Sequence, residues 1–221
     1  MRRDLASGRG QQQVAAAEML QHCGAEGIEV LRQNLSSASK RRTLLVCEVL
    51  GKIGPEATAA IDDLAALAPL ADRDLATAAS LALVRITKDK TPPVRRLLGL
   101  AAQGSRQRQF TTIGQMSQLP ADAVPVVAQF LGDNDPQLRR TAMQTLVVIL
   151  IAGENSEGLQ RLQRSSAVLQ VLEQATQNPH ETIAAAARDI LRMYDDGELD
   201  RFIERRGPSM VPFATGVGCP F

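Results

Sequence analysis

The sequence predicts an all-α fold, a right-handed α-solenoid of about five antiparallel helix pairs that follow a leading half repeat. One observation is compositional: hydrophobic residues make up 44% of the chain, but aromatics only 3%, with no Trp. Such a composition favours helices packed through small residues over β-sandwiches. The other is that pairs of helical apolar patterns recur at roughly 30 to 35 residues. A single pair cannot bury its apolar faces, so the pairs are expected to stack on one another.

Two repeats show the pattern most clearly. In the first of them, a helix opens at Gly54-Pro55-Glu56-Ala57 and a second runs over residues 75–86. In the other, Pro120-Ala121-Asp122-Ala123 opens a helix, and a second helix follows residue 135. The same two-helix unit has therefore recurred.

The start of that last helix has a specific chemistry. Asp135 is a good N-cap, because its carboxylate can accept from the free amides of the next turn. Pro136 fits the first helical position, where no amide hydrogen is needed. Leu138, Ala142 and Leu146 then recur at helical spacing, which predicts a face buried against the preceding helix.

The rest of the chain fits the same plan. Residues 1–194 are expected to form the repeat solenoid, and residues 195–221 a short helix followed by a Gly/Pro-rich apolar tail. The remaining helices are expected over residues 11–23, 25–35, 40–53, 93–102, 106–119, 157–177 and 181–194.

Two motifs carry a family resemblance. The stretch L-G-D-N-D-P-Q-L-R-R-x-A-x-x-x-L at 131–146 and V-L-G-K-I-G-P-E-A-x-x-A-I-x-x-L at 49–64 resemble HEAT repeats. More narrowly they resemble the short bacterial kind first described in phycobilin lyases, over about residues 11–194. Tetratricopeptide units typically contain a Trp and several Tyr, but this chain has no Trp and one Tyr. Ankyrin units contain a T-P-L-H motif, which is also absent from the sequence. The resemblance implies that second helices line the concave side.

Basic residues stand where second helices begin in three units, and the resemblance implies that they form a ladder along the groove. They are Arg41, Arg42, Arg106, Arg108, Arg139 and Arg140. One interpretation is a surface that binds an acidic segment of a partner. The other is structural pairing with acids of a neighbouring unit, for which Asp72, Asp74, Asp133 and Asp135 are suitable. Ala76 and Thr77 interrupt the ladder in the second full unit, which argues against a continuous nucleic-acid track.

The tail offers a second set of binding residues. The segment GPSMVPFATGVGCPF is uncharged and rich in Gly and Pro, so it cannot continue the helices. Phe213 and Phe221 are predicted anchors that dock on a partner or in the chain's own groove. The alternative is a loosely packed terminus.

Composition also bounds the partners and the compartment. The formal net charge of +1 argues against general polyanion binding. The three cysteines have no paired metal-ligand spacing, and their odd number suits a reducing compartment. No apolar run is long enough to span a membrane, and MRRDLASGRG lacks the h-region of a secretory signal. We expect a cytoplasmic protein without membrane insertion.

Enzymatic alternatives rest on few residues. His180-Glu181 is similar to the pairs of deoxyhypusine hydroxylase, but the chain has two histidines, so no metal is expected. Cys23 or Cys47 could accept a bilin as in a lyase, although a free Cys within an apolar helix pattern is typically a core residue. HEAT-like alkylpurine DNA glycosylases share the length and class, but their aromatic clamp relies largely on Trp.

The sequence therefore predicts a non-catalytic scaffold or adaptor without a cofactor. It would hold a protein partner on the second-helix face, with an acidic segment as the candidate ligand. Two alternatives stay open. One is an accessory subunit of a larger assembly, with the tail docked on a neighbour. The other is a lyase-type or nucleic-acid-processing protein.

Overall fold

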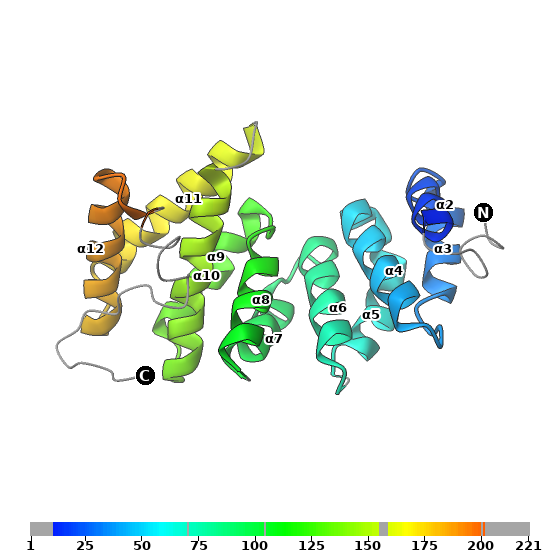
Figure 1. The fold of residues 1–221 in the computed structure, drawn as a ribbon, viewed down its shortest axis with the longest axis horizontal. Helices are drawn as coiled ribbons and strands as arrows, with labels where there is room; N and C mark the ends of the chain where they lie inside the picture. The colour runs from blue at the N-terminus through cyan, green and yellow to red at the C-terminus, as the bar shows by residue number, and fades with distance from the viewer. Residues whose placement is uncertain (1–10, 70, 104, 155–158, 200, 202–221) are drawn as a thin grey trace. The chain divides into compact units, whose positions relative to one another are not determined.

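The structure is a computed structural model that describes residues 11–69, 71–103, 105–154, 159–199 and 201 (Figure 1). Every element in these ranges is helical, which confirms the predicted all-α class. The α-helices are α2 (Gln11–Gln21), α3 (Gly24–Gln33), α4 (Lys40–Ile53), α5 (Ile61–Leu67), α6 (Arg73–Ile86), α7 (Thr91–Ala102), α8 (Arg106–Met116), α9 (Val124–Gln129), α10 (Pro136–Glu154), α11 (Leu159–Ala175) and α12 (Glu181–Asp195). The 3-10 helices are η1 (Gly54–Ala60), η2 (Ala121–Ala123) and η3 (Phe130–Gly132).

The helices divide between two compact units, residues 1–96 and residues 97–221, with the boundary inside α7. Within the described residues, α2 stands without a first helix, and five helix pairs follow it. This number agrees with the predicted five pairs and leading half repeat. Residues 1–10, which precede α2, lie outside the described ranges.

The first unit consists of two layers of helices. The second helices α2, α4 and α6 lie side by side in one layer, while α3 packs against η1, and α5 packs against α6 (Figure 1). Leucines from both layers fill the space between them, and Leu31, Leu50 and Leu64 are fully buried. Each pair buries its apolar face on its neighbours, which is the arrangement of an α-solenoid.

The second unit repeats this arrangement. Helix α10 packs against both α8 and α12 in the layer of second helices, and α11 packs against α9. Met116, Met143, Leu146 and Ile149 are fully buried in this unit. Small, flexible and branched side chains thus replace the aromatic residues that the composition lacks.

Helix ends follow the predicted chemistry at two positions. The Asp135 carboxylate accepts from the Gln137 amide at 2.8 Å, so it caps α10 as expected, and Pro136 opens the helix. Gly54 ends α4 with a φ of 73°, a left-handed conformation that favours glycine.

Several predicted helix boundaries differ from the structure by two or more residues, and three of them are informative. Helix α6 begins at Arg73 rather than at residue 75, because the Asp72 carboxylate accepts from the amides of Asp74 and Leu75. Residues 54–60 form a 3-10 helix, and the α-helix starts only at Ile61. Helix α8 ends at Met116, three residues before the predicted Leu119.

Side chains of later helix pairs donate to carbonyl oxygens at the ends of earlier helices. Arg96 donates to Ala68 at 3.1 Å, Arg164 to Ser117 at 3.4 Å, and Asn178 to Leu131 at 3.5 Å. The last carbonyls of a helix have no partner within that helix. These contacts therefore supply donors for carbonyl oxygens of one helix pair from residues of a later pair.

The predicted tail falls almost wholly outside the described residues. Of the short helix expected at 199–205, the structure describes residues 199 and 201, which are helical, and Leu199 is buried. Phe213 and Phe221 lie outside the described ranges.

Candidate partner-binding site

The six predicted arginines all lie at the starts of second helices. Arg41 and Arg42 belong to α4, Arg106 and Arg108 to α8, and Arg139 and Arg140 to α10. Arg41, Arg106 and Arg108 are exposed, whereas the other three are half-buried. The helix α4 belongs to the first unit, and α8 and α10 belong to the second.

In the second unit, α8 and α10 are neighbours that begin at the same end. The Thr145 hydroxyl of α10 donates to the sulfur of Met116 in α8 at 3.8 Å, and each residue lies nine or ten positions after the start of its helix. The two helix starts therefore lie close together, since packed helix axes are separated by about 8 to 10 Å. This places the starts of both helices, with Arg106, Arg108, Arg139 and Arg140, at one end of the unit.

Arg139 has a structural role in this group. Its guanidinium donates to the carbonyl oxygens of Asp133 at 2.7 Å and Asn134 at 3.1 Å, in the loop that precedes its own helix. The Asp133 carboxylate in turn accepts from the Asp135 amide at 2.9 Å. Arg139 thus orders the loop while it adds positive charge to the site.

The start of α8 differs from that of α10 because no acidic residue compensates it. Ser105 makes no side-chain capping bond, and the first turn contains no acid. Within the described ranges, Arg106 and Arg108 have no ion pair or hydrogen-bonding partner. A helix start carries partial positive charge, so cations there oppose the helix dipole. The result is an exposed positive surface, which we call the α8 start (residues 105–108).

Contacts with α7 fix the position of the α8 start. The Gln109 side-chain amide donates to the Ala102 carbonyl oxygen, near the end of α7, at 3.2 Å. Thr112 and Ile113 in the following turns are buried. The arginines therefore project from a helix that is anchored on its inner side.

In the first unit, a different cation makes the predicted contact with the neighbouring repeat. Lys40, the first residue of α4, lies 2.9 Å from Asp72 and 2.6 Å from Asp74 at the start of α6. The pKa of Lys40 is raised by its hydrogen bond to Asp74 and, to a smaller extent, by its hydrogen bond to Asp72. The hydrogen bond from Lys40 lowers the pKa of Asp72. Asp72 and Asp74 are thus paired between repeats as expected, but with Lys40 rather than with the predicted arginines.

A second ion pair joins repeats in the layer of first helices. Arg32 of α3 lies 2.6 Å from Asp63 of α5, and 3.1 Å from Glu29 in its own helix. Neither Arg32 nor Asp63 was predicted from the sequence to make such a contact. Their signal was a cation near the end of one helix and an acid in the next first helix.

A buried threonine marks the start of second helices and was also missed. Thr43, Thr77 and Thr141 are nearly inaccessible, and each hydroxyl donates to the carbonyl oxygen four residues earlier. Thr112 is buried in the corresponding part of α8. The signal was present as Arg-Arg-Thr, which occurs at residues 41–43 and 139–141. These threonines satisfy their own hydroxyls and thereby allow a polar residue between packed helices.

The residues considered for enzymatic roles do not converge in the described ranges. His180 precedes α12, and the Glu181 carboxylate accepts from Arg188 at 2.6 Å. Burial raises the pKa of the Cys47 thiol to about 12, while Cys23 is exposed. No group of three or more potential metal-ligating side chains occurs there.

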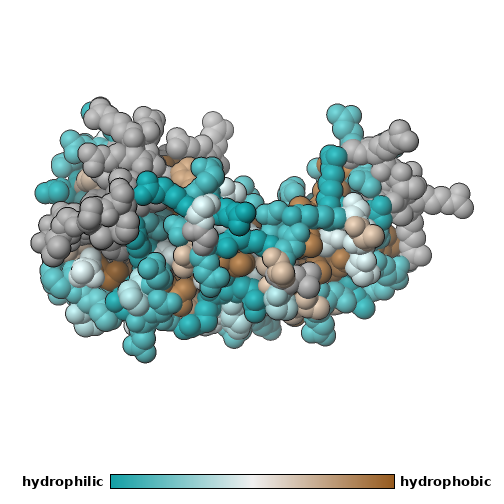
Figure 2. All heavy atoms as spheres, turned by 60° about the horizontal axis from the view of Figure 1, so that its bottom comes forward, coloured by the Kyte–Doolittle hydropathy of each residue, from teal (hydrophilic) through white to brown (hydrophobic). Residues whose placement is uncertain are grey.

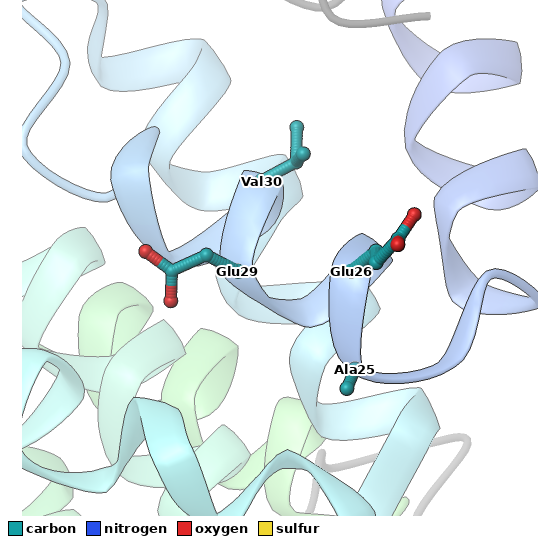
Figure 3. Close-up of a pocket in the computed structure, with 4 residues that line it drawn as sticks. All are labelled: Ala25, Glu26, Glu29 and Val30. Carbon is teal, nitrogen blue, oxygen red and sulfur yellow. The ribbon is translucent and has the colours of Figure 1, made fainter.

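A shallow surface depression lies along α3, lined by Ala25, Glu26, Glu29 and Val30. Figure 3 shows that Glu26 and Glu29 point to opposite sides of the helix rather than toward each other. Glu29 is also engaged by Arg32 and by the Gln33 side chain. This depression does not bring reactive groups together.

On the face seen in Figure 2, hydrophilic residues cover most of the surface and hydrophobic ones appear in small separate patches. Three large apolar side chains are exposed in the described ranges: Val14, Met19 and Phe110. No helix in these ranges has the length and hydropathy needed to cross a bilayer.

Comparisons with known proteins give a distant structural likeness. No family model and no curated protein sequence matches the chain. Among solved structures, it is similar to a designed armadillo repeat protein in complex with the peptide (KR)4. The TM-score is 0.40 at 15% identity, over 86% of this chain and 96% of that one. The fold assignment therefore rests on the helix packing described above, and membership of the HEAT-like family stays a prediction.

Proposed function

We propose that the protein is a non-catalytic scaffold that binds an acidic segment of a protein partner at the α8 start. The observation that carries this proposal is the contrast between the two units. In the first, Lys40 is paired with Asp72 and Asp74 of the next repeat. At the α8 start, Arg106 and Arg108 are exposed and have no such acids within the described residues.

Physical cost supports a functional interpretation of these arginines. Cations in the first turn of a helix are unfavourable by some tenths of a kcal/mol, and an unpaired surface charge contributes little to folding. An acidic ligand would reverse both effects, because its carboxylates would pair with Arg106 and Arg108 and face the free amides of the helix start. On the adjacent helix, Arg139 and Arg140 are accompanied by Asp133 and Asp135, so the positive potential of the site comes chiefly from Arg106 and Arg108.

A charge-reversal experiment tests the proposal. The probe is a fluorescein-labelled peptide of eight glutamates, and its binding to the intact chain is followed by fluorescence anisotropy at low and moderate salt. We expect Arg106→Glu/Arg108→Glu to weaken binding by about tenfold or more, since reversal makes each contact repulsive. Circular dichroism should show unchanged helicity, because both side chains are exposed.

Lys52→Glu/Lys88→Glu provides the matched control. It changes the net charge by the same amount, two reversals of two charges each, at exposed residues remote from α8 in sequence. Its binding should stay close to that of the unmodified protein. Equal weakening in both variants would show that only net charge matters, and unchanged binding in the α8 variant would refute the proposed site.

The same assay distinguishes the nucleic-acid alternative from binding of an acidic peptide. Single-stranded oligothymidine replaces the peptide, and the affinity is measured against salt concentration. Binding to several phosphates would give a steep linear fall of the logarithm of affinity with the logarithm of salt. Tighter binding of the oligonucleotide than of the peptide, with that slope, would favour nucleic acid over an acidic protein segment.

A second candidate function has one specific observation in its favour. Met19 is 52% exposed and Val14 is 37% exposed on α2, the helix that lacks a described pairing helix. An accessory subunit whose first repeat is covered by another chain would bury them. Light scattering of Met19→Glu against the unmodified protein tests this, because only an assembly that uses this face should dissociate.

A further inference from the structure

We propose that the segment bound at the α8 start combines an acidic residue with an apolar one. Its carboxylate pairs with Arg106, and its apolar side chain packs beside Phe110 over Gly114. This inference rests on the proposed function and specifies the chemistry of the partner.

The first support is the position of Phe110. It is 43% exposed, and it is the one aromatic among the exposed large apolar residues of the described ranges. Arg106, Phe110 and Gly114 are spaced by four residues, so they follow one another along the same side of α8. A cation and an aromatic ring therefore stand one turn apart on a single strip.

The second support is the glycine beyond the ring. A Cβ added at Gly114 would meet no atom within 4 Å, so neither packing nor steric crowding in this chain requires a glycine there. Glycine inside a helix is unfavourable relative to alanine. The adjacent outward residue Thr111 is exposed as well. Gly114 thus leaves an open shelf next to Phe110, and a partner side chain can occupy it.

The chemistry of the occupant follows from the charges along the strip. The cations lie at the beginning of α8, while Gln107, Thr111 and Gln115 around the shelf are exposed and uncharged. Acidic residues of the partner are attracted to the first turn, and the apolar contact forms further along the helix. The ion pair fixes the orientation of the segment, and removal of apolar surface from water adds non-directional affinity.

The length of the strip sets the spacing within the segment. Arg106 and Gly114 are eight residues apart, which is about 12 Å along a helix. An extended peptide covers this distance in about four residues at ~3.3 Å each. The expected partner motif therefore carries its apolar side chain about four residues from its acid.

Two fluorescein-labelled peptides test this arrangement on the full chain. One contains two glutamates in a Gly/Ser background, and the other contains the same glutamates with a phenylalanine four residues away. We expect the phenylalanine peptide to bind about tenfold more tightly, the fold-change equivalent to about 1.4 kcal/mol. Phe110→Ser should remove this advantage and leave binding of the acid-only peptide unchanged.

Gly114→Lys distinguishes binding by charge alone from binding that also needs the open space at Gly114, because the two cases predict opposite changes in affinity for the phenylalanine peptide. If charge alone matters, the added cation tightens binding of both peptides. If the shelf holds the apolar side chain, Gly114→Lys weakens the phenylalanine peptide but not the acid-only peptide. Gly99→Lys in α7 is the control, because a Cβ added at Gly99 also meets nothing within 4 Å. It should not reduce the difference between the two peptides.

The outcomes separate this inference from the proposed function. Equal affinity of the two peptides, with sensitivity to Arg106→Glu/Arg108→Glu retained, would overturn the apolar shelf and leave the acidic site in place. Failure of both peptides to bind, together with failure of the glutamate octamer, would overturn both proposals. An advantage for phenylalanine that persists in Phe110→Ser would also refute the shelf.

Discussion

Gly51 of α4 packs so closely against Ala82 of α6 that even a Cβ atom at residue 51 would be tightly crowded. A Cβ added at Gly51 would lie 3.2 Å from the Ala82 Cα atom and 3.5 Å from its Cβ atom. Two small residues thus let neighbouring second helices approach closely, as the low content of large side chains predicted.

Replacement of Gly51 should therefore destabilise the first unit. We expect Gly51→Leu to lower the free energy of unfolding by about 1 to 3 kcal/mol, because overpacking forces the helices apart. Gly114→Ala is the control, since it also removes a glycine from a helix interior but without a clash, and it should stabilise by about 0.5 to 1 kcal/mol. Urea unfolding followed by circular dichroism measures both. A Gly51→Leu protein as stable as the unmodified one would contradict the close packing.

The contacts of Lys40 should make the stability of the first unit depend on pH. The pKa of Asp72 is lowered, so its contribution is present above the ordinary carboxyl range and is lost as the pH falls through its folded value, below 3.8. The pKa of Lys40 is raised, so its contribution is present below 10.5 and is lost as the pH rises above that value. Lys40→Met should therefore be less stable than the unmodified protein at pH 7.

The measurement is the difference in urea midpoint between Lys40→Met and the unmodified protein. This difference should shrink at pH 3 and in high salt, since the ion pairs are exposed and screened. Lys88→Met, at an exposed loop residue, should show no such dependence. A difference that stays constant from pH 7 to pH 3 would indicate that Lys40 acts through its aliphatic chain alone.

The two described cysteines should differ in reactivity. Cys23 is exposed, whereas burial raises the pKa of Cys47 to about 12 from 9.0. Alkylation with iodoacetamide at pH 8, followed by peptide mass mapping, should modify Cys23 in the native protein and Cys47 only after unfolding. Because the folded pKa of Cys47 exceeds the unfolded one, stability should fall as the pH rises from about 9 toward 12. Rapid native modification of Cys47 would show that its helix opens readily.

The cap of α10 should contribute measurably to the second unit. Asp135→Ala removes the acceptor of the Gln137 amide and should cost about 1 kcal/mol. Asp135→Asn keeps a capping oxygen and should cost less, which separates the cap from the charge. Equal stability of all three proteins in urea would show that the Asp133–Arg139 loop contacts are sufficient to hold the helix start.

Helix positions were predictable where an end signal coincides with the apolar pattern. The helix over residues 40–53 is found as predicted, because Gly54 ends it. The 3-10 start of the next helix was missed, since Pro55 and the following residues suit either kind of first turn. The start of α6 was predicted incorrectly for a similar reason. Asp72, Arg73 and Asp74 are all charged, so the sequence does not show which of the two acids caps the helix.

The ladder of cations was predictable only as a group. Successive residues of a helix point about 100° apart, so which cation reaches the next repeat depends on the rotation of the helix. Lys40 reaches Asp72 and Asp74, while Arg41 in the next position is exposed. The exposure of Phe110 beside the open position at Gly114 was not predicted, because a repeat pattern alone does not show which side of α8 stays uncovered.

Carbonyl oxygens at or near the ends of α5, α8 and η3 receive hydrogen bonds from Arg96, Arg164 and Asn178, which come later in the chain. Shortening the chain from its C-terminal side would therefore do more than remove packing area. Each truncation would remove hydrogen-bond donors from an earlier repeat and leave its carbonyl oxygens without those partners. The repeats depend on their successors, so a shortened array needs a new terminal helix that supplies those donors.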